Sequence, residues 1–159
     1  MTKGKRIIAA IALIDSNTYV INKFHLKTTR TMEKRINYAS GSIWEDFVGY
    51  SRVVKVGNVI EVAGTVAAGN DGKVVGKDDV YAQTKFILKK IVDSLEMVGA
   101  KSKDIIRTRM YVTNISNWEE IGKAHSEFFS EIKPVATIVE VKGLIGPDFL
   151  IEIEATALM

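Results

Sequence analysis

Charged side chains alternate with apolar ones in two short stretches of the chain, 105–113 and 149–158. Because successive side chains of a strand point to opposite faces, Glu152 and Glu154 share one face in the second stretch, as Arg107 and Arg109 do in the first. A carboxylate held in this way can orient water or accept a proton, and an arginine can bind an anion through its planar guanidinium. Two interpretations remain open: a solvated outer face, or a cleft that a partner subunit covers.

The composition restricts the class of protein. The chain has 159 residues, 47% of them hydrophobic and 26% charged, as expected for one globular domain. It has no cysteine, which excludes disulfides and thiolate chemistry and fits a cytoplasmic protein. His25 and His125 lie far apart without the spacing of metal ligands. We therefore expect no metal site and no cofactor.

The charge is unevenly distributed along the chain. Residues 1–31 hold six of the 22 basic residues and one of the 19 acidic residues, which leaves 16 basic and 18 acidic residues in 32–159. A net charge of −2 in this larger part argues against nucleic acid as a partner, because such binding needs clustered Lys and Arg.

The first 31 residues form an extension with three possible interpretations. A basic start and the apolar run 7–14 are compatible with a signal peptide, with an edge strand or loose arm, or with an extension upstream of a functional start at Met32. The run is too short to span a bilayer, so no membrane contact is expected. We place the domain at 32–159 and leave the order of 1–31 open.

Hydrophobic periodicity predicts the elements of this domain. A hairpin at 53–62 turns at Gly57-Asn58 and ends at Gly64, and the glycine-containing segment 67–77 is a turn rather than a phosphate loop. A helix begins after Asp78 or Asp79, runs to Met97 and stops before Gly99. Strands at 105–113, 135–141 and 149–158 and a helix at 117–130 follow. This order predicts an α+β sandwich with two helices on one face of a mixed sheet.

Two of these elements have an expected apolar stripe. Ile106, Thr108, Met110 and Val112 form it in the strand, and Trp118, Ile121, His125 and Phe128 form it in the second helix. His125 is then either a packed histidine whose ring is hydrogen-bonded to a backbone carbonyl, or a residue that serves as an acid, as a base or as a contact to a ligand.

Several separated blocks resemble one family. They are YSRVVKVGNVIEVAGT from Tyr50, the pair Gln83-Thr84, GAKSKDIIRTRMYVTN from Gly99, the pair Phe128-Phe129, and PVATIVEV from Pro134 followed by IEIEATA. Together they resemble the RidA/YjgF family of enamine/imine deaminases, also described as L-PSP endoribonucleases, from Met32 to the end. The resemblance implies a chorismate-mutase-like sandwich, a homotrimer with an inner barrel, and clefts between subunits.

The resemblance also implies roles for individual residues. Glu152 matches the glutamate that positions water, and Tyr50 matches the tyrosine of the cleft. Ala136, beside Thr137 at the substrate-binding block, stands where deaminating members have an arginine that grips the substrate carboxylate, and Ala63 replaces a serine. Because alanine cannot bind a carboxylate, we expect a poor 2-iminopropionate deaminase.

Arg109 and His125 are the candidates to compensate for that arginine. If either reaches the cleft, a site for a small carboxylate ligand survives with altered geometry. The alternative for Arg109 is an ion pair with a glutamate on a neighbouring strand.

Three functions follow from these expectations. The first is cofactor-free hydrolysis of an enamine, imine or related C–N bond in a small metabolite, and the second is a non-catalytic trimer that binds a metabolite or a protein. The third, a ribonuclease or translation inhibitor, is disfavoured by the acidic domain.

Overall fold

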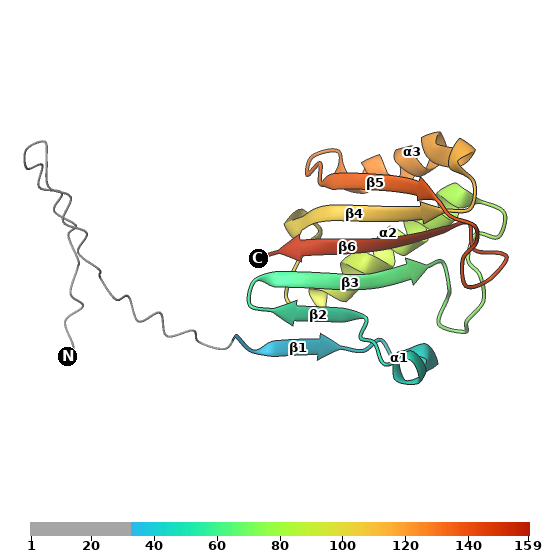
Figure 1. Cartoon of the computed structure of the whole chain (residues 1–159). Coiled ribbons are helices and arrows are strands. Elements are labelled where there is room, and N and C mark those ends of the chain that lie inside the picture. The colour runs from blue at the N-terminus through green and yellow to red at the C-terminus, as the bar shows by residue number, and fades with distance from the viewer. Residues whose placement is uncertain (1–32) are drawn as a thin grey trace, which may run out of the picture. The chain divides into compact units, whose positions relative to one another are not determined.

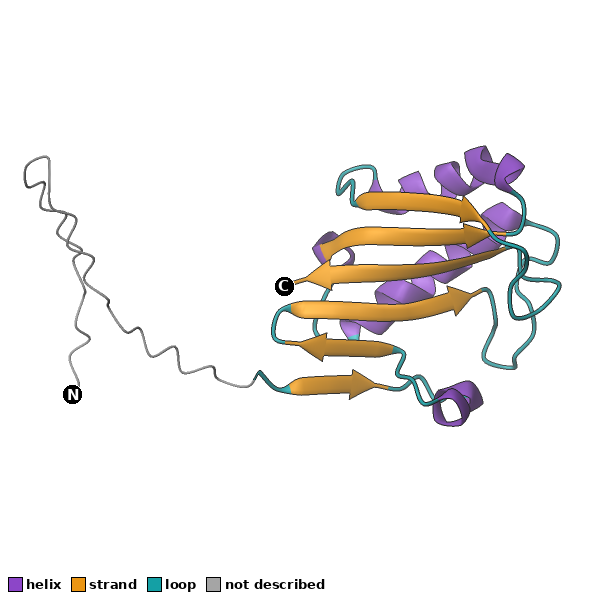
Figure 2. Cartoon of the chain, in the orientation of Figure 1, coloured by secondary structure: helices purple, strands orange, loops and turns teal. Residues whose placement is uncertain are grey.

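The computed structural model describes residues 33–159, which form one six-stranded mixed sheet with helices on one face (Figures 1 and 2). The strands lie in the order β1-β2-β3-β6-β4-β5. Their bounds are β1 Arg35–Tyr38, β2 Val53–Val56, β3 Val59–Val66, β4 Ile105–Val112, β5 Val135–Glu140 and β6 Ile151–Leu158. The predicted α+β fold is thereby confirmed.

The hairpin of β2 and β3 forms as predicted, and β3 is longer than expected. Gly57 takes a positive φ of 60° at the turn, a conformation that favours glycine. β3 then continues through Gly64 to Val66, with a register shift against β6 between Val62 and Thr65. The prediction that Gly64 ends the strand was therefore wrong, because a bulge lets the chain pass this glycine without leaving the sheet.

Two long helices cover one face of the sheet (Figure 1). Helix α2, Val80–Glu96, begins at Asp79, whose carboxylate accepts a hydrogen bond from the Ala82 amide at 2.9 Å. Helix α3, Trp118–Phe129, joins β4 to β5, and this crossover makes β4 and β5 the parallel pair of an otherwise antiparallel sheet. The side chains that fill the space between sheet and helices include Ile60, Val62, Ile87, Leu88, Ile91, Leu95, Ile121, Phe129, Ile151 and Ile153.

Two expected apolar stripes are shifted. The register of β4 against β6 changes between Ile105 and Arg107, which buries Ile105 and leaves Ile106 46% exposed. In α3, Trp118 is 58% exposed, whereas Ile121 and Phe129 are buried. Each prediction was wrong at its first residue. The register shift at the start of β4 turns Ile106 away from the core, and Trp118 is the first residue of α3, where the buried face of the helix has not yet begun.

Two elements precede the hairpin that the periodicity did not predict. β1 pairs with β2 as an edge strand, and the short helix α1, Ile43–Val48, follows it. Ser42 accepts a hydrogen bond from the Trp44 amide at the start of α1, and Gly49 ends it with φ 79°. Most apolar side chains of α1, including Phe47 at 81%, are exposed. The expectations for residues 1–31 lie outside the described residues.

Within residues 33–159, no helix is long and apolar enough to cross a membrane.

Candidate functional site

Glu152 lies near the start of β6, on the sheet face opposite the helices. Its partners in register are Tyr111 on β4 and Val66 on β3, while its chain neighbours Ile151 and Ile153 are buried against the helices. The alternation of β6 therefore places Glu152 and Glu154 on the face predicted from the sequence.

The carboxylate of Glu152 lies directly against the backbone of Gly64. A Cβ atom on Gly64 would overlap the Glu152 carboxylate in this position, so the glycine leaves room for the close approach. Glu152 is half-buried, and this burial raises the pKa of its carboxyl group. The charge of Glu154 raises the pKa further, whereas the charge of Arg52 lowers it in part.

A shallow open hollow of about 540 Å³ lies on the same face. Its lining comes from β1, β2, β3, β4, β6 and the segment after α1, and includes Arg35, Asn37, Tyr50, Ala63, Arg109 and Glu154. Glu152 is next to this hollow rather than in its lining, since it contacts Gly64, the neighbour of Ala63. Tyr50 and Arg109 thus both line this hollow of a single chain.

Arg109 is engaged by a carboxylate of its own sheet. Its Nη1 lies 2.7 Å from Oε1 of Glu154, the residue opposite it in the β4–β6 register. The hydroxyl of Tyr111 donates to the same oxygen at 3.3 Å, and burial together with Glu154 raises the pKa of Tyr111. The ion-pair alternative for Arg109 is therefore the one that forms, and this guanidinium is only partly available to a ligand.

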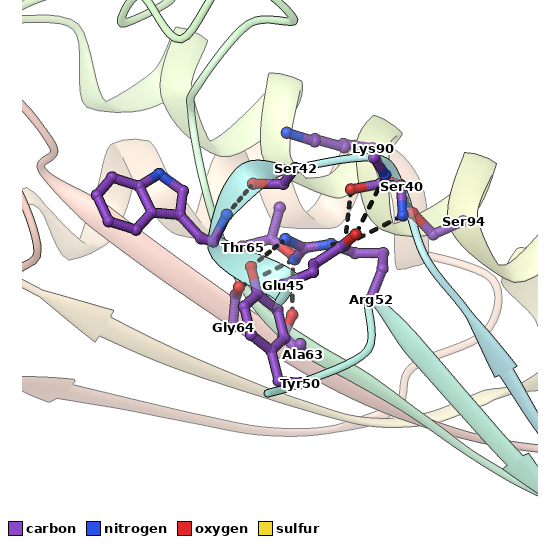
Figure 3. Close-up of polar contacts among 12 residues, drawn as sticks. Ser40, Ser42, Glu45, Tyr50, Arg52, Ala63, Gly64, Thr65, Lys90 and Ser94 are labelled. Atoms are coloured by element: carbon purple, nitrogen blue, oxygen red, sulfur yellow. Dashed lines mark hydrogen bonds and ion pairs between the residues drawn. The ribbon is translucent and has the colours of Figure 1, made fainter. Parts of the chain in front are cut away.

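A buried arginine that sequence reasoning did not select contacts Tyr50, one of the residues that line this hollow (Figure 3). Arg52 is 6% exposed, and its Nη1 donates to the Gly64 carbonyl and to Oγ1 of Thr65, both at 3.0 Å. Its Nη2 donates to the hydroxyl oxygen of Tyr50 at 3.2 Å. A single side chain thus connects Tyr50 to the bulge of β3 that supports Glu152.

Arg52 has a buried counter-charge in α1. Oε1 of Glu45 lies 3.8 Å from Nε of Arg52, and Glu45 is 4% exposed. Its carboxylate also accepts hydrogen bonds from the amide and hydroxyl of Ser40 and from the amide of Gly41. Burial acts to raise the pKa of Glu45, but these bonds and the charge of Arg52 outweigh it and lower the pKa. No periodic pattern marked this pair, because its members are in a turn and a helix too short to have one.

The other predicted site residues are elsewhere. Nε2 of His125 is 3.0 Å from Oγ1 of Thr108, on the side of the sheet that the helices cover, and burial lowers the pKa of His125. Ala136 pairs with Thr108 and so belongs to the helix-facing side, whereas Thr137 pairs with Arg109 on the face of Glu152. Within one subunit, the structure therefore brings Tyr50, Arg109 and Glu152 to one face and leaves His125 and Ala136 on the other.

No group of three or more acidic or histidine side chains within residues 33–159 is arranged to hold a metal ion.

A family model described as Endoribonuclease L-PSP matches residues 44–159. The chain belongs to this family. The match includes every element from α1 onward and both members of the Glu45–Arg52 pair.

Relatives of this chain include one protein named for an activity and one without a named activity. The uncharacterised protein SCO2049 of Streptomyces coelicolor is 35% identical over 118 residues, which are 74% of this chain and 87% of that protein. The 3-aminoacrylate deaminase RutC of Acinetobacter baylyi is 31% identical over 108 residues, which are 68% of this chain and 85% of RutC.

Solved structures give the same assignment. Rv2704 of Mycobacterium tuberculosis, described as a member of the YjgF/YER057c/UK114 family, is 44% identical. It superposes with a TM-score of 0.72 over 79% of this chain and all of that chain. The sheet and helices of residues 33–159 are thus those of a YjgF-type domain.

Proposed function

We propose that this protein binds a small enamine or imine bearing a carboxylate and hydrolyses its C–N bond, with Glu152 as the residue that orients the attacking water. The observation that carries the proposal is the half-buried Glu152 carboxylate lying against Gly64 on the open face of the sheet. A relative named 3-aminoacrylate deaminase, 31% identical to this chain, supports this class of substrate.

The chemistry needs only water and a base. Water adds to the electrophilic imine carbon, and the Glu152 carboxylate accepts a proton from it and passes a proton to the nitrogen, giving a carbinolamine. Transfer of the remaining hydroxyl proton to the nitrogen then lets the C–N bond break, which releases ammonia and leaves a carbonyl compound. An enamine is first protonated on carbon to give the imine. The raised pKa of Glu152 suits this role, because a base works best with a pKa closer to the working pH.

We further propose that the complete site lies between subunits of a homotrimer. Within one chain, Ala136 and Thr137 are exposed on the edge strand β5, and Ala136 does not share a face with Glu152. A second copy that covers the open face can bring its own β5 to Glu152. This arrangement agrees with the inter-subunit cleft that the sequence resemblance implies.

The decisive experiment measures ammonia release from freshly generated 3-aminoacrylate by the wild type, Glu152→Gln and Glu131→Gln. Glu131 is an exposed residue beyond the end of α3, so its substitution is a matched control for the loss of one carboxylate. We expect Glu152→Gln to lower kcat/KM by about 100-fold or more, in the range of general base catalysis, and Glu131→Gln to leave it unchanged. Equal turnover by all three proteins would contradict the role of Glu152.

A non-catalytic binding protein is the second candidate, and the Arg109–Glu154 ion pair favours it. Because Glu154 occupies Arg109 and alanine stands at position 136, a substrate carboxylate lacks the arginine that fixes it for reaction in a deaminating member, which favours binding without turnover. Calorimetric binding of 2-oxobutyrate without ammonia release from either 3-aminoacrylate or 2-iminopropionate would support this second function.

A further inference from the structure

We propose that Arg52 is a positioning residue: its hydrogen bond to the Tyr50 oxygen orients the hydroxyl so that its proton is donated to an oxygen of the ligand. We further propose that Glu45 holds Arg52 in place. This inference rests on the proposed function for the identity of the ligand. Its geometry rests on the buried contacts of Arg52 alone.

The guanidinium of Arg52 donates hydrogen bonds in two directions. Two bonds from Nη1 end on the β3 bulge, at Gly64 and Thr65, and the bond from Nη2 ends on Tyr50. The Thr65 hydroxyl donates in turn to the Ala63 carbonyl at 2.8 Å. The planar guanidinium therefore sets the position of Tyr50 relative to the strand that carries the wall of the hollow.

The Tyr50 hydroxyl accepts a hydrogen bond from Arg52. A guanidinium has only donors, so the phenol oxygen must accept from Arg52 and its own proton cannot be used in that contact. Among residues 33–159, the phenol oxygen has no other hydrogen-bond partner. Because Tyr50 lines the hollow, its free O–H can donate to an acceptor there, such as a carboxylate or carbonyl oxygen of the ligand.

Arg52 is also supported from α1. Glu45 sits 3.8 Å from the guanidinium, and three hydrogen bonds from Ser40 and Gly41 hold its carboxylate. Figure 3 shows Glu45 and Tyr50 on either side of Arg52. A buried charge of this kind costs free energy unless it is paired, so the Glu45 carboxylate offsets the cost of burying the Arg52 guanidinium in this position.

Arg52 also acts on Glu152 through its charge. The charged groups that influence the pKa of the Glu152 carboxyl are Glu154 on its own strand, which raises it, and Arg52 beside the β3 bulge, which lowers it. The positive charge opposes the raised pKa of Glu152, so neutralising Arg52 should move the Glu152 titration to higher pH.

The test with substrate is a double-mutant cycle, with freshly generated 3-aminoacrylate as the probe. We expect Tyr50→Phe and Arg52→Lys each to raise KM by about 10-fold, since a hydrogen bond to a charged ligand oxygen contributes in this range. If Arg52 acts through the Tyr50 hydroxyl, the double variant should have the KM of Tyr50→Phe alone, within about twofold. Additive effects on KM, near 100-fold in the double variant, would overturn the inference.

A second measurement needs no substrate. Tyrosine labelled with ¹³C at Cζ reports on hydrogen bonding of the phenol oxygen by NMR, and Tyr50→Phe identifies the Tyr50 resonance. We expect this resonance to move in Arg52→Lys and to stay in place in the control Arg107→Lys, an arginine on β4 outside this network. Glutamate labelled at Cδ should show Glu152 titrating at higher pH in Arg52→Gln than in the wild type.

Glu45→Gln provides a variant that retains Arg52. It should move the Tyr50 resonance in the same direction as Arg52→Lys but by less, while Glu131→Gln should leave it unmoved. An unmoved Tyr50 resonance in both Arg52→Lys and Glu45→Gln would overturn the inference even if the enzyme turns over. A wild type that releases no ammonia and binds no carboxylate would instead contradict the proposed function, and the NMR result would still decide the role of Arg52.

Discussion

At the scale of single residues, the candidate site depends on Glu152, whose environment disfavours the ionised form of its carboxyl group. Glu152 is half-buried, lies against a glycine backbone and has a second carboxylate, Glu154, on the same face. Burial and the charge of Glu154 both disfavour its ionised form. A group kept under such conditions is a candidate for chemistry, since selection for stability alone would replace it.

Glu152→Gln should therefore raise the melting temperature at pH 7 while lowering activity. A folded-state pKa above the unfolded value means that Glu152 contributes most to stability below pH 4.5, and that this contribution is lost as the pH rises through the folded pKa. Thermal melts of the two proteins should differ at pH 7 and converge towards pH 4. A wild type that melts above the glutamine variant at pH 7 would show that Glu152 is stabilised by contacts absent from one chain.

Ala136→Arg tests whether an arginine at position 136 can bind the carboxylate of the substrate. A charge-assisted hydrogen bond contributes about 1.5–3 kcal/mol, so a restored arginine should increase kcat/KM for 2-iminopropionate by about 10- to 100-fold over a poor wild type. Ammonia release measures the gain, and Ser130→Arg, at the exposed end of α3, is the control. Strong wild-type turnover that disappears in Arg109→Ala would mean that Arg109 already holds the carboxylate.

At the scale of elements, bulges decide which residues enter the core. The register of β4 against β6 shifts so that Ile105 is buried rather than Ile106. The register of β3 against β6 shifts between Val62 and Thr65, where Gly64 lies. Helix α3 packs through residues after its first turn, with Ile121 buried at 1% exposure. The register shifts in β3 and β4 thus decide which side chains lie on the sheet face opposite the helices.

Helix α3 supplies the prediction at this scale. Ile121→Ala should lower the free energy of unfolding by about 2–5 kcal/mol, because it leaves a cavity in the core. Trp118→Ala, on the exposed start of the same helix, should change it by less than about 1 kcal/mol despite removing a larger side chain. Urea denaturation of both variants measures the difference, and an equal loss would place Trp118 in a contact with another subunit.

At the scale of the whole molecule, residues Met32–Met159 form one compact unit. Its sheet has one face covered by α2 and α3 and one face without a helical cover (Figure 2). The uncovered face includes the charged residues Arg107, Arg109, Glu152 and Glu154 together with the exposed apolar Val135 and Val139. Such a mixed face is typical of a surface that another subunit covers.

We therefore expect a homotrimer. Light scattering after gel filtration at micromolar protein should give three times the mass of the 159-residue chain. A monomer mass would remove the proposed inter-subunit cleft and with it the role of position 136.

Deletion of residues 1–31 should leave this unit and its oligomer intact. The family match begins at residue 44, downstream of the deletion. We expect the melting temperature to fall by less than about 5 °C, which corresponds to about 1–2 kcal/mol for a domain of this size. A larger fall, or loss of the oligomer in gel filtration, would show that the segment 7–14 contributes to the fold.

The sequence by itself determined the hairpin of β2 and β3, both long helices and the faces of β6, because each depends on periodicity within one segment. It also placed Glu152 and Glu154 on one face. Only the tertiary structure decided which face Ile106 takes, that Gly64 accommodates Glu152, and that Arg52 links Glu45 to Tyr50. These features depend on register and contact between segments far apart in the chain, and a one-residue shift in register moves a side chain to the other face of a sheet.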